Sequence, residues 1–248
     1  MSALLSARAL GKHFDGVVAA EQVTIDVCAG ERLGLIGSNG AGKTTFVNMI
    51  TGYLKPDTGA IEFDGRDIAP LGPREISRLG VARSFQIPQL CPEMSVLDNM
   101  LVAAACGDGA LSSWRPAHTA QKRDRAHALL ERFSLAAHAP RRVAELPGGV
   151  RKLLDIAMAL THRPRLLVLD EPTSGVSVEE KFPMMDTIMA ALGSEGTTVL
   201  FVEHDMEIVT RYSSRVAAFY SGRILADGPP AKVLADDDVR RYVTGGRR

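Results

Sequence analysis

One short segment constrains the fold of this chain more than any other: residues 37–44 read Gly-Ser-Asn-Gly-Ala-Gly-Lys-Thr, and Thr45 follows. These residues fill every fixed position of the phosphate-loop pattern G-x-x-x-x-G-K-[ST]. The apolar run 33–36 before the loop predicts a buried strand. Residues 45–51, which contain neither Pro nor Gly, predict the first turns of a helix. A strand, a glycine-rich loop and a helix in this order indicate an α/β fold.

This arrangement has a direct chemical use. Glycines let the backbone curl so that successive N–H groups point at phosphate oxygens, and the helix N-terminus adds the positive end of its dipole. Lys43 is long enough to reach the β- and γ-phosphates, and the hydroxyl of Thr44 can ligate Mg²⁺. The alternative, a glycine-rich turn that merely precedes a helix, leaves the filled pattern unexplained. The segment therefore predicts a nucleoside triphosphate site made by Gly37, Ser38, Asn39, Gly40, Ala41, Gly42, Lys43, Thr44 and Thr45.

Composition sets outer limits on partners and compartment. The chain has 248 residues, 46% hydrophobic and 23% charged, which is ordinary for a globular protein, and its formal net charge is zero. A neutral chain gives no reason to expect nucleic acid or an anionic membrane surface as a partner. Three cysteines without a paired spacing indicate a reduced, intracellular protein without a metal cluster. No run approaches the ~20 apolar residues of a membrane span, and no signal peptide is visible, so any membrane role is expected to be peripheral.

The chain changes character twice along its length. Up to about residue 85, short apolar runs separated by turns predict strands, and from about 95 to 160 Ala/Leu/Arg-rich stretches predict helices. Strand signals then return. The pattern indicates an α/β core interrupted by a helical insertion of roughly 70 residues. The expected strands are 23–27, 32–36, 60–63, 81–85, 166–169, 197–202 and 216–220, the expected helices are 96–105, 119–133 and 151–160, and residues 106–118, with Trp114, are expected to form a surface loop.

A second segment, which is acidic, adds the carboxylates that a nucleoside triphosphate site needs. Residues 165–172 (RLLVLDEP) form a hydrophobic strand that ends in two carboxylates. A strand that delivers Asp170 beside a phosphate loop can hold Mg²⁺ there. Glu171, one residue on, can act as the general base or orient the attacking water. A buried strand ending in an acidic turn is the alternative, and the upstream phosphate loop disfavours it.

Three shorter features carry weaker signals by themselves. Residues 146–150 (Leu-Pro-Gly-Gly-Val) run into a helix, and a helix that starts on Pro and Gly presents free N–H groups to an anion. Gln86 follows the expected strand 81–85, where its side chain can reach Mg²⁺ or water. His204 ends another expected strand, and a histidine there can hydrogen-bond a γ-phosphate or its water.

Taken together and in this order, these segments resemble an ATP-binding-cassette (ABC) ATPase, and the resemblance covers nearly the whole chain. It implies an α/β fold with a P-loop NTPase core, a RecA-like mixed sheet with flanking helices, an antiparallel β segment and an inserted helical subdomain. It also implies a single ABC ATPase domain over residues 1–248. The core is expected at about 1–86 and 164–248, and the helical subdomain at about 87–163.

The resemblance assigns a role to each motif. Residues 37–45 correspond to Walker A, 146–150 to the family signature, 166–172 to Walker B and 174–177 to the D-loop. The implied cofactors are ATP and Mg²⁺. The implied site residues are Phe14, stacking on adenine, and Leu146, Pro147, Gly148 and Gly149 for the nucleotide; Thr44, Gln86 and Asp170 for the metal; and Glu171, His204 and Gln86 for catalysis.

A finer resemblance is to the ATPases of branched-chain amino-acid importers. It rests on Arg83-Ser84-Phe85-Gln86, the stretch 94–99, the loop near 106–118 and the short tail 230–246. It implies a second, different ATPase subunit in a head-to-tail dimer, two transmembrane permease subunits, a periplasmic solute-binding protein acting indirectly, no nucleic acid, and a peripheral place on the cytoplasmic side of the inner membrane. Urea or amide importers share these features, and the motifs hardly separate importers from lipid or exporter-type systems. A DNA-repair or translation ATPase is disfavoured by the single cassette and neutral charge, and a non-hydrolysing cassette by the intact Lys43, Asp170, Glu171 and His204.

The signature departs from the usual L-S-G-G-Q of the family. Pro147 stands in the serine position and Val150 in the glutamine position, while Ser177 occupies a D-loop position that is often acidic or amide. Proline removes both the hydroxyl and the N–H, and losing a charge-assisted hydrogen bond costs about 1.5–3 kcal/mol. We therefore expect two unequal composite ATP sites, with the one closed by Pro147 the weaker. The alternative, that the backbone N–H groups of Gly148 and Gly149 suffice, stays open.

Overall fold

The computed structural model describes residues 3–106, 119–193 and 196–245. Packing divides the chain into two compact units, one formed by residues 1–81 with 198–248 and the other by residues 82–197. The loop expected at 106–118, with Trp114, lies outside the described residues except for Cys106. The division into a core and a helical subdomain at 86/87 and 163/164 stays a prediction.

The first unit contains an antiparallel sheet in the order β2-β1-β4-β5. The strand at the very start of the chain, β1, has no counterpart among the expected strands. Its alternation is broken between Ala7 and Leu10, where the register with β2 shifts and Ala9 adopts a φ of 46°. A bulge of this kind hides the period-2 pattern on which strand prediction depends. The strands are β1 (Ala3–Phe14), β2 (Val17–Cys28), β4 (Thr58–Phe63) and β5 (Arg66–Asp67).

The first unit also holds strands in the order β10-β9-β3-β8. The central strand β3 runs parallel to both β8 and β9, and β10 returns antiparallel to β9. All five residues of β8 are buried, as are the last five of β3, because strands of a covered parallel sheet pack on both faces. The strands are β3 (Arg32–Gly37), β8 (Thr198–Val202), β9 (Arg215–Tyr220) and β10 (Arg223–Gly228).

Within the residues that the structure describes, the first unit has five helices. Helix α1 is anchored by Phe46, which is fully buried and lies 5.7 Å, centroid to centroid, from the ring of Phe219 on β9. Tyr242 of the last helix packs in the same manner on Tyr220, at 4.7 Å. These aromatic contacts fix both helices against one strand. The helices are α1 (Lys43–Ile50), α2 (Pro73–Arg78), α7 (Met206–Tyr212), α8 (Pro230–Ala235) and α9 (Asp237–Tyr242).

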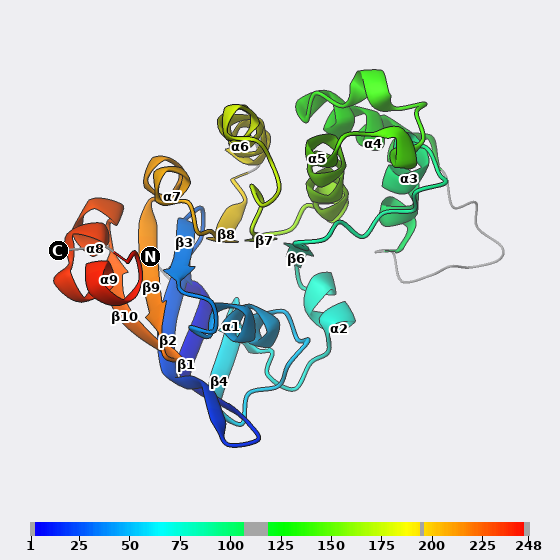
Figure 1. Cartoon of the computed structure of the whole chain (residues 1–248). Coiled ribbons are helices and arrows are strands. Elements are labelled where there is room, and N and C mark those ends of the chain that lie inside the picture. The colour runs from blue at the N-terminus through cyan, green and yellow to red at the C-terminus, as the bar shows by residue number, and fades with distance from the viewer. Residues whose placement is uncertain (1–2, 107–118, 194–195, 246–248) are drawn as a thin grey trace. The chain divides into compact units, whose positions relative to one another are not determined.

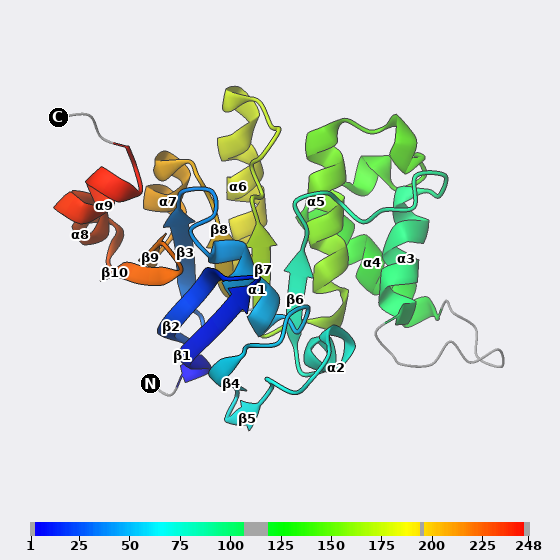
Figure 2. The same ribbon diagram turned by 60° about the horizontal axis from the view of Figure 1, so that its bottom comes forward.

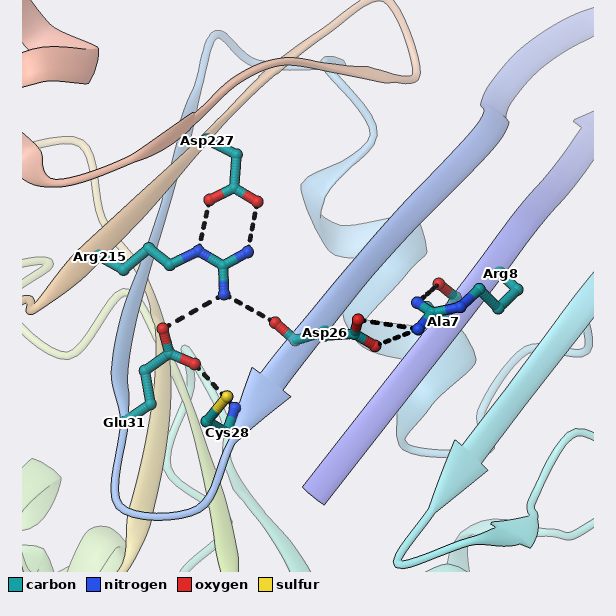
Figure 3. Close-up of polar contacts among 7 residues, drawn as sticks. All are labelled: Ala7, Arg8, Asp26, Cys28, Glu31, Arg215 and Asp227. Atoms are coloured by element: carbon teal, nitrogen blue, oxygen red, sulfur yellow. Dashed lines mark hydrogen bonds and ion pairs between the residues drawn. The ribbon is translucent and has the colours of Figure 1, made fainter. Parts of the chain in front are cut away.

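An arginine on β9 ties three parts of the first unit together (Figure 3). Arg215 makes a two-pronged ion pair with Asp227 of β10, donates to the backbone carbonyl of Asp26 on β2, and lies 3.3 Å from Glu31. Glu31 in turn accepts the backbone N–H of Cys28 at 2.8 Å. The carboxylate of Asp227 raises the pKa of Arg215 well above its usual range. The guanidinium therefore stays charged and holds the two sheets of this unit to each other.

Over its described residues, 82–106, 119–193 and 196–197, the second unit combines two neighbouring strands, β6 and β7, with four α-helices. Helices α3, α4 and α5 lie side by side, as Figures 1 and 2 both show. Their buried side chains include Met100, Leu130 and Leu154. The strands are β6 (Val81–Ser84) and β7 (Leu166–Asp170). The α-helices are α3 (Val96–Cys106), α4 (Ala120–Arg132), α5 (Gly148–Ala159) and α6 (Val178–Gly193), with 3-10 turns η1 (Ala136–His138), η2 (Val143–Glu145) and η3 (Leu160–His162).

The expected α/β fold class is confirmed, with a mixed sheet, an antiparallel β segment and a group of helices. Most expected strands and helices are present with ends displaced by a few residues. The expected helix at 151–160 begins earlier, at Gly148, because the Pro147 carbonyl accepts the N–H of Arg151 and so starts the first turn. Among the described residues, no helix is long and apolar enough to cross a membrane.

Candidate active site

The phosphate loop connects β3 with α1, as the sequence predicts. Gly37 is the last residue of β3, and Lys43 is the first residue of α1. No side chain caps α1, since its N-cap residue is Gly42. The first backbone N–H groups of this helix are therefore available for an anion, as a phosphate site requires.

Two glycines of the loop cannot be replaced without a clash. Gly42 has a φ of +102°, and a Cβ there would lie 2.5 Å from the carbonyl oxygen of Ala19 on β2. Gly37 has a φ of +156°, and its Cβ would lie 2.6 Å from the carbonyl oxygen of Phe219. The loop thus runs against the backbones of β2 and β9, and this close approach fixes its shape.

Lys43 is folded back onto the loop that it follows. Its Nζ donates to the carbonyl oxygens of Gly37 at 2.7 Å and Ser38 at 3.1 Å, and the residue is 5% exposed. Thr44, the next residue, is exposed, and Thr45 is half-buried. The ammonium group is therefore held against the loop by two carbonyl oxygens, which are acceptors of the kind that phosphates also supply.

Phe14 lies at the tip of the β1–β2 hairpin. Its ring is 46% exposed, and the Nζ of Lys12 is 5.6 Å from the ring centroid. Both central residues of the turn, Asp15 and Gly16, have positive φ, as a type I′ hairpin requires. The exposed ring face is suited to stacking on a base, although this role stays a prediction.

His204 follows β8, which is parallel to β3. Leu35 of β3 pairs with Val202 of β8, so the two strands end on the same edge of the sheet. The phosphate loop follows β3 at that edge, and His204 lies just after the end of β8. The backbone N–H of His204 is fixed by the carboxylate of Glu203, which is 3% exposed. Topology therefore places the histidine at the same edge of the sheet as the loop.

In the second unit, Asp170 ends β7 in a buried ion pair. Its Oδ2 lies 2.6 Å from a terminal nitrogen of Arg83 on β6, and the side chains are 11% and 9% exposed. The guanidinium also lies over the ring of Phe85, with 5.0 Å between Cζ and the ring centroid. Arg83 thus supplies the positive charge beside Asp170 in this structure.

Glu171 and Gln86, two expected catalytic residues, contact each other. The Nε2 of Gln86 donates to Oε2 of Glu171 at 2.9 Å. Glu171 adopts a φ of +49°, in the left-handed region that non-glycine residues rarely enter. Strain of this kind is often found at functional positions, where surrounding contacts hold it.

The turn at Leu146 to Gly149 begins α5. Leu146 is buried and anchors the turn, while Pro147 is the N-cap residue with a φ of −58°. A Cβ built on Gly148 or Gly149 meets no atom within 4 Å, so open space lies in front of this helix start. A helix start leaves its first backbone N–H groups without acceptors inside the helix, and proline contributes neither an N–H nor a hydroxyl.

Two charged residues of this region are not among the site residues that the sequence predicts. Lys152 and Asp155 lie on α5, are 5% and 7% exposed, and contact the segments that carry Glu171 and Gln86. The only sequence signal for them is charge at positions of a helix that is otherwise apolar there. That signal does not say which segments they contact.

Comparison with known proteins agrees with this geometry. A family model described as ABC transporter matches residues 20–174. The high-affinity branched-chain amino acid transport ATP-binding protein LivG of Escherichia coli K12 is 36% identical over 250 residues, which is 98% of each chain. A probable LivG of Archaeoglobus fulgidus is 34% identical, over 98% of this chain and 96% of that one. The crystal structure of the ADP conformation of an ATP-binding cassette of an ABC transporter superposes with a TM-score of 0.88 at 32% identity, covering 97% and 98%.

A nucleotide-binding loop in an α/β core with an added group of helices defines a P-loop ATPase. More specifically, the chain belongs to the ABC transporter family, of which it is an ATP-binding cassette. Its activity is ATP hydrolysis coupled to transport. The roles of the individual site residues are proposals.

Proposed function

We propose that this chain is the ATPase subunit of an importer of branched-chain amino acids. The observation that carries the proposal is end-to-end similarity, because the E. coli protein of that name aligns with 98% of this chain and is itself covered to 98%. Such a subunit lies at the cytoplasmic side of the inner membrane. It works with two transmembrane permease subunits and receives solute through a periplasmic solute-binding protein.

ATP is held by the backbone N–H groups of the phosphate loop and by Lys43, and Phe14 stacks on adenine. The ammonium of Lys43, which now donates to carbonyls of its own loop, exchanges these for phosphate oxygens. Glu171 accepts a proton from the attacking water, with His204 beside the γ-phosphate. Gln86 orients the Glu171 carboxylate through the contact already in place.

Mg²⁺ suits the oxygen donors that this chain offers. The hydroxyl of Thr44, the carbonyl of Gln86 and the carboxylate of Asp170 are hard oxygen ligands of the kind that Mg²⁺ takes. When bound, the ion neutralises charge on the β- and γ-phosphates. The guanidinium of Arg83, 2.6 Å from Oδ2, fixes the position of the Asp170 carboxylate.

The partner is a second, different ATPase subunit in a head-to-tail dimer, in which each phosphate loop is closed by the other subunit's signature. Pro147 leaves this chain's signature without a side-chain donor. Gly148 and Gly149 lie beside open space at the start of α5. The site that contains this chain's Lys43 and Glu171 is therefore the more active of the two. The site that Pro147 closes is the weaker.

The test is ATP-dependent uptake by the assembled transporter in proteoliposomes. Labelled leucine should enter with wild-type protein, and Glu171→Gln should abolish uptake, while urea should not be taken up. Uptake of urea without leucine would overturn the substrate assignment. For the unequal sites, Glu171→Gln here should reduce ATPase more than the equivalent change in the partner, and equal losses would overturn the asymmetry.

A further inference from the structure

Helix α5 carries two buried groups of opposite charge on one face. Lys152 is 5% exposed and Asp155 is 7% exposed, and residues three apart on a helix are neighbours on its surface. Charged side chains are seldom buried to this degree without specific partners. Neither residue is among those that the phosphate chemistry requires.

The carboxylate of Asp155 holds the segment that contains Gln86. Its Oδ2 accepts the hydroxyl of Ser84 at 2.7 Å and the backbone N–H of Phe85 at 3.3 Å. Its Oδ1 accepts the backbone N–H of Gln89 at 3.1 Å. These three donors lie on both sides of Gln86 in the sequence, so one side chain on α5 fixes both ends of the Gln86 loop.

The ammonium of Lys152 holds the segment that contains Glu171. Its Nζ donates to the carbonyl oxygen of Glu171 at 2.6 Å and to that of Ser174 at 3.0 Å. Glu171 has the left-handed φ of +49° described above, and its carbonyl oxygen also accepts the N–H of Ser174. Lys152 therefore stabilises the turn in which the strained backbone of Glu171 sits.

The two held segments meet at the contact between Gln86 and Glu171. We infer that Lys152 and Asp155 are positioning residues that set the Gln86–Glu171 geometry from α5, the helix that begins at the Pro147 turn. A displacement of α5 carries both segments with it, because each is bonded to the same helix face. The inference rests on the proposed catalytic role of Glu171.

The experiment compares Asp155→Asn and Lys152→Met with Asn99→Ala in the assembled transporter. Asn99 is a matched control, because it is fully buried in the same unit and bonds backbone groups of Cys91 and Ser95 instead. We expect kcat to fall by up to about tenfold in Asp155→Asn, no more than in Gln86→Ala, and by about tenfold to a hundredfold in Lys152→Met, since a displaced catalytic group loses rate on that scale. The KM for ATP should change by less than about twofold, because nucleotide binding is not what these residues serve.

Three further readouts separate positioning from loss of structure. Hydrogen exchange at the amides of Phe85 and Gln89 should become faster in Asp155→Asn and stay unchanged in Asn99→Ala. The double variant Asp155→Asn/Gln86→Ala should be no slower than Gln86→Ala, since Asp155 acts through Gln86. Lys152→Arg, which keeps the charge, should recover part of the rate that Lys152→Met loses.

A kcat in the α5 variants equal to that of Asn99→Ala would overturn the inference, and so would an additive double variant. If Asp155→Asn does not fold, Ser84→Ala removes one donor to the same carboxylate and should give a smaller loss of kcat in the same direction. Glu171→Gln keeps the two proposals distinguishable. Unchanged hydrolysis in that variant would overturn the proposed catalytic role of Glu171, whereas a normal kcat in the α5 variants overturns only the positioning role.

Discussion

The side-chain amide of Gln86 donates a hydrogen bond to the carboxylate of Glu171, with 2.9 Å between Nε2 and Oε2. The two residues are 85 positions apart in the sequence. Their contact joins the loop after β6 to the end of β7, so the carboxylate has a fixed direction before any substrate is present. Such preorganisation is a principal source of enzymatic rate.

Replacing either residue should therefore reduce turnover, to different extents. Glu171→Gln removes the general base, and we expect kcat to fall by about 10²–10⁴-fold, the usual contribution of such a group. Gln86→Ala leaves the carboxylate but not its orientation, and we expect a loss of about tenfold. Steady-state ATPase assays of the assembled transporter measure both. A larger loss in Gln86→Ala than in Glu171→Gln would contradict the assignment.

The buried pair of Arg83 and Asp170 should be important for stability. Arg83→Met leaves the Asp170 carboxylate buried without its cation, and breaking such a pair from one side costs about 3–5 kcal/mol in the free energy of unfolding. The double variant Arg83→Met/Asp170→Leu should recover much of this loss, because no isolated charge remains. Urea denaturation measures these differences. Additive losses in the double variant would show that the pair is not coupled.

The phosphate loop offers a pair of glycines for comparison. Gly40 and Gly42 both have positive φ, but a Cβ on Gly40 meets no atom within 4 Å, whereas one on Gly42 lies 2.5 Å from the Ala19 carbonyl oxygen. Gly40→Ala should lower the unfolding free energy by about 1–2 kcal/mol, because alanine is strained at positive φ although its Cβ meets no other atom. Gly42→Ala should cost more and should also weaken ATP binding, because the loop must shift. Calorimetric titration and denaturation check both, and equal effects would argue against the close approach to β2.

Asp155 should make the free energy of unfolding depend on pH, and the direction follows from the shift of its pKa. Burial raises the pKa of its carboxyl above the ordinary value of 3.8, and the hydrogen bonds from Ser84, Gln89 and Phe85 and the charge of Lys152 oppose this shift in part. Between the ordinary and the raised pKa, the folded chain binds more protons than the unfolded chain. The contribution of Asp155 to the unfolding free energy therefore falls as pH rises through this window and is least favourable above the folded pKa.

The measurement is urea denaturation of the wild type and Asp155→Asn over a pH series. The unfolding free energy of the wild type relative to this variant should increase as pH is lowered from neutral toward about 4. The difference between the wild type and Asn99→Ala should not follow this trend, since no ionisable group is exchanged. A relative stability that decreases on acidification would mean that the pKa of Asp155 is lowered instead.

From the amino-acid sequence alone one can predict the phosphate loop, the acidic end of β7 and the order of the motifs. These are local patterns, since each depends on a few consecutive residues whose backbone and side chains act together. For the same reason, most strands and helices could be predicted with small errors at their ends. β1 was missed because a bulge interrupts its alternation.

Which side chains hold the catalytic residues in place depends on the packing of segments that are distant in the sequence. Arg83 pairs with Asp170 across 87 positions, and Asp155 reaches Gln89 and Ser84 across 66 and 71. A charged residue in a helix has the same local pattern whether it faces water or a buried carbonyl. Its partner is set by the packing of distant segments, and burial then decides how strongly that charge acts.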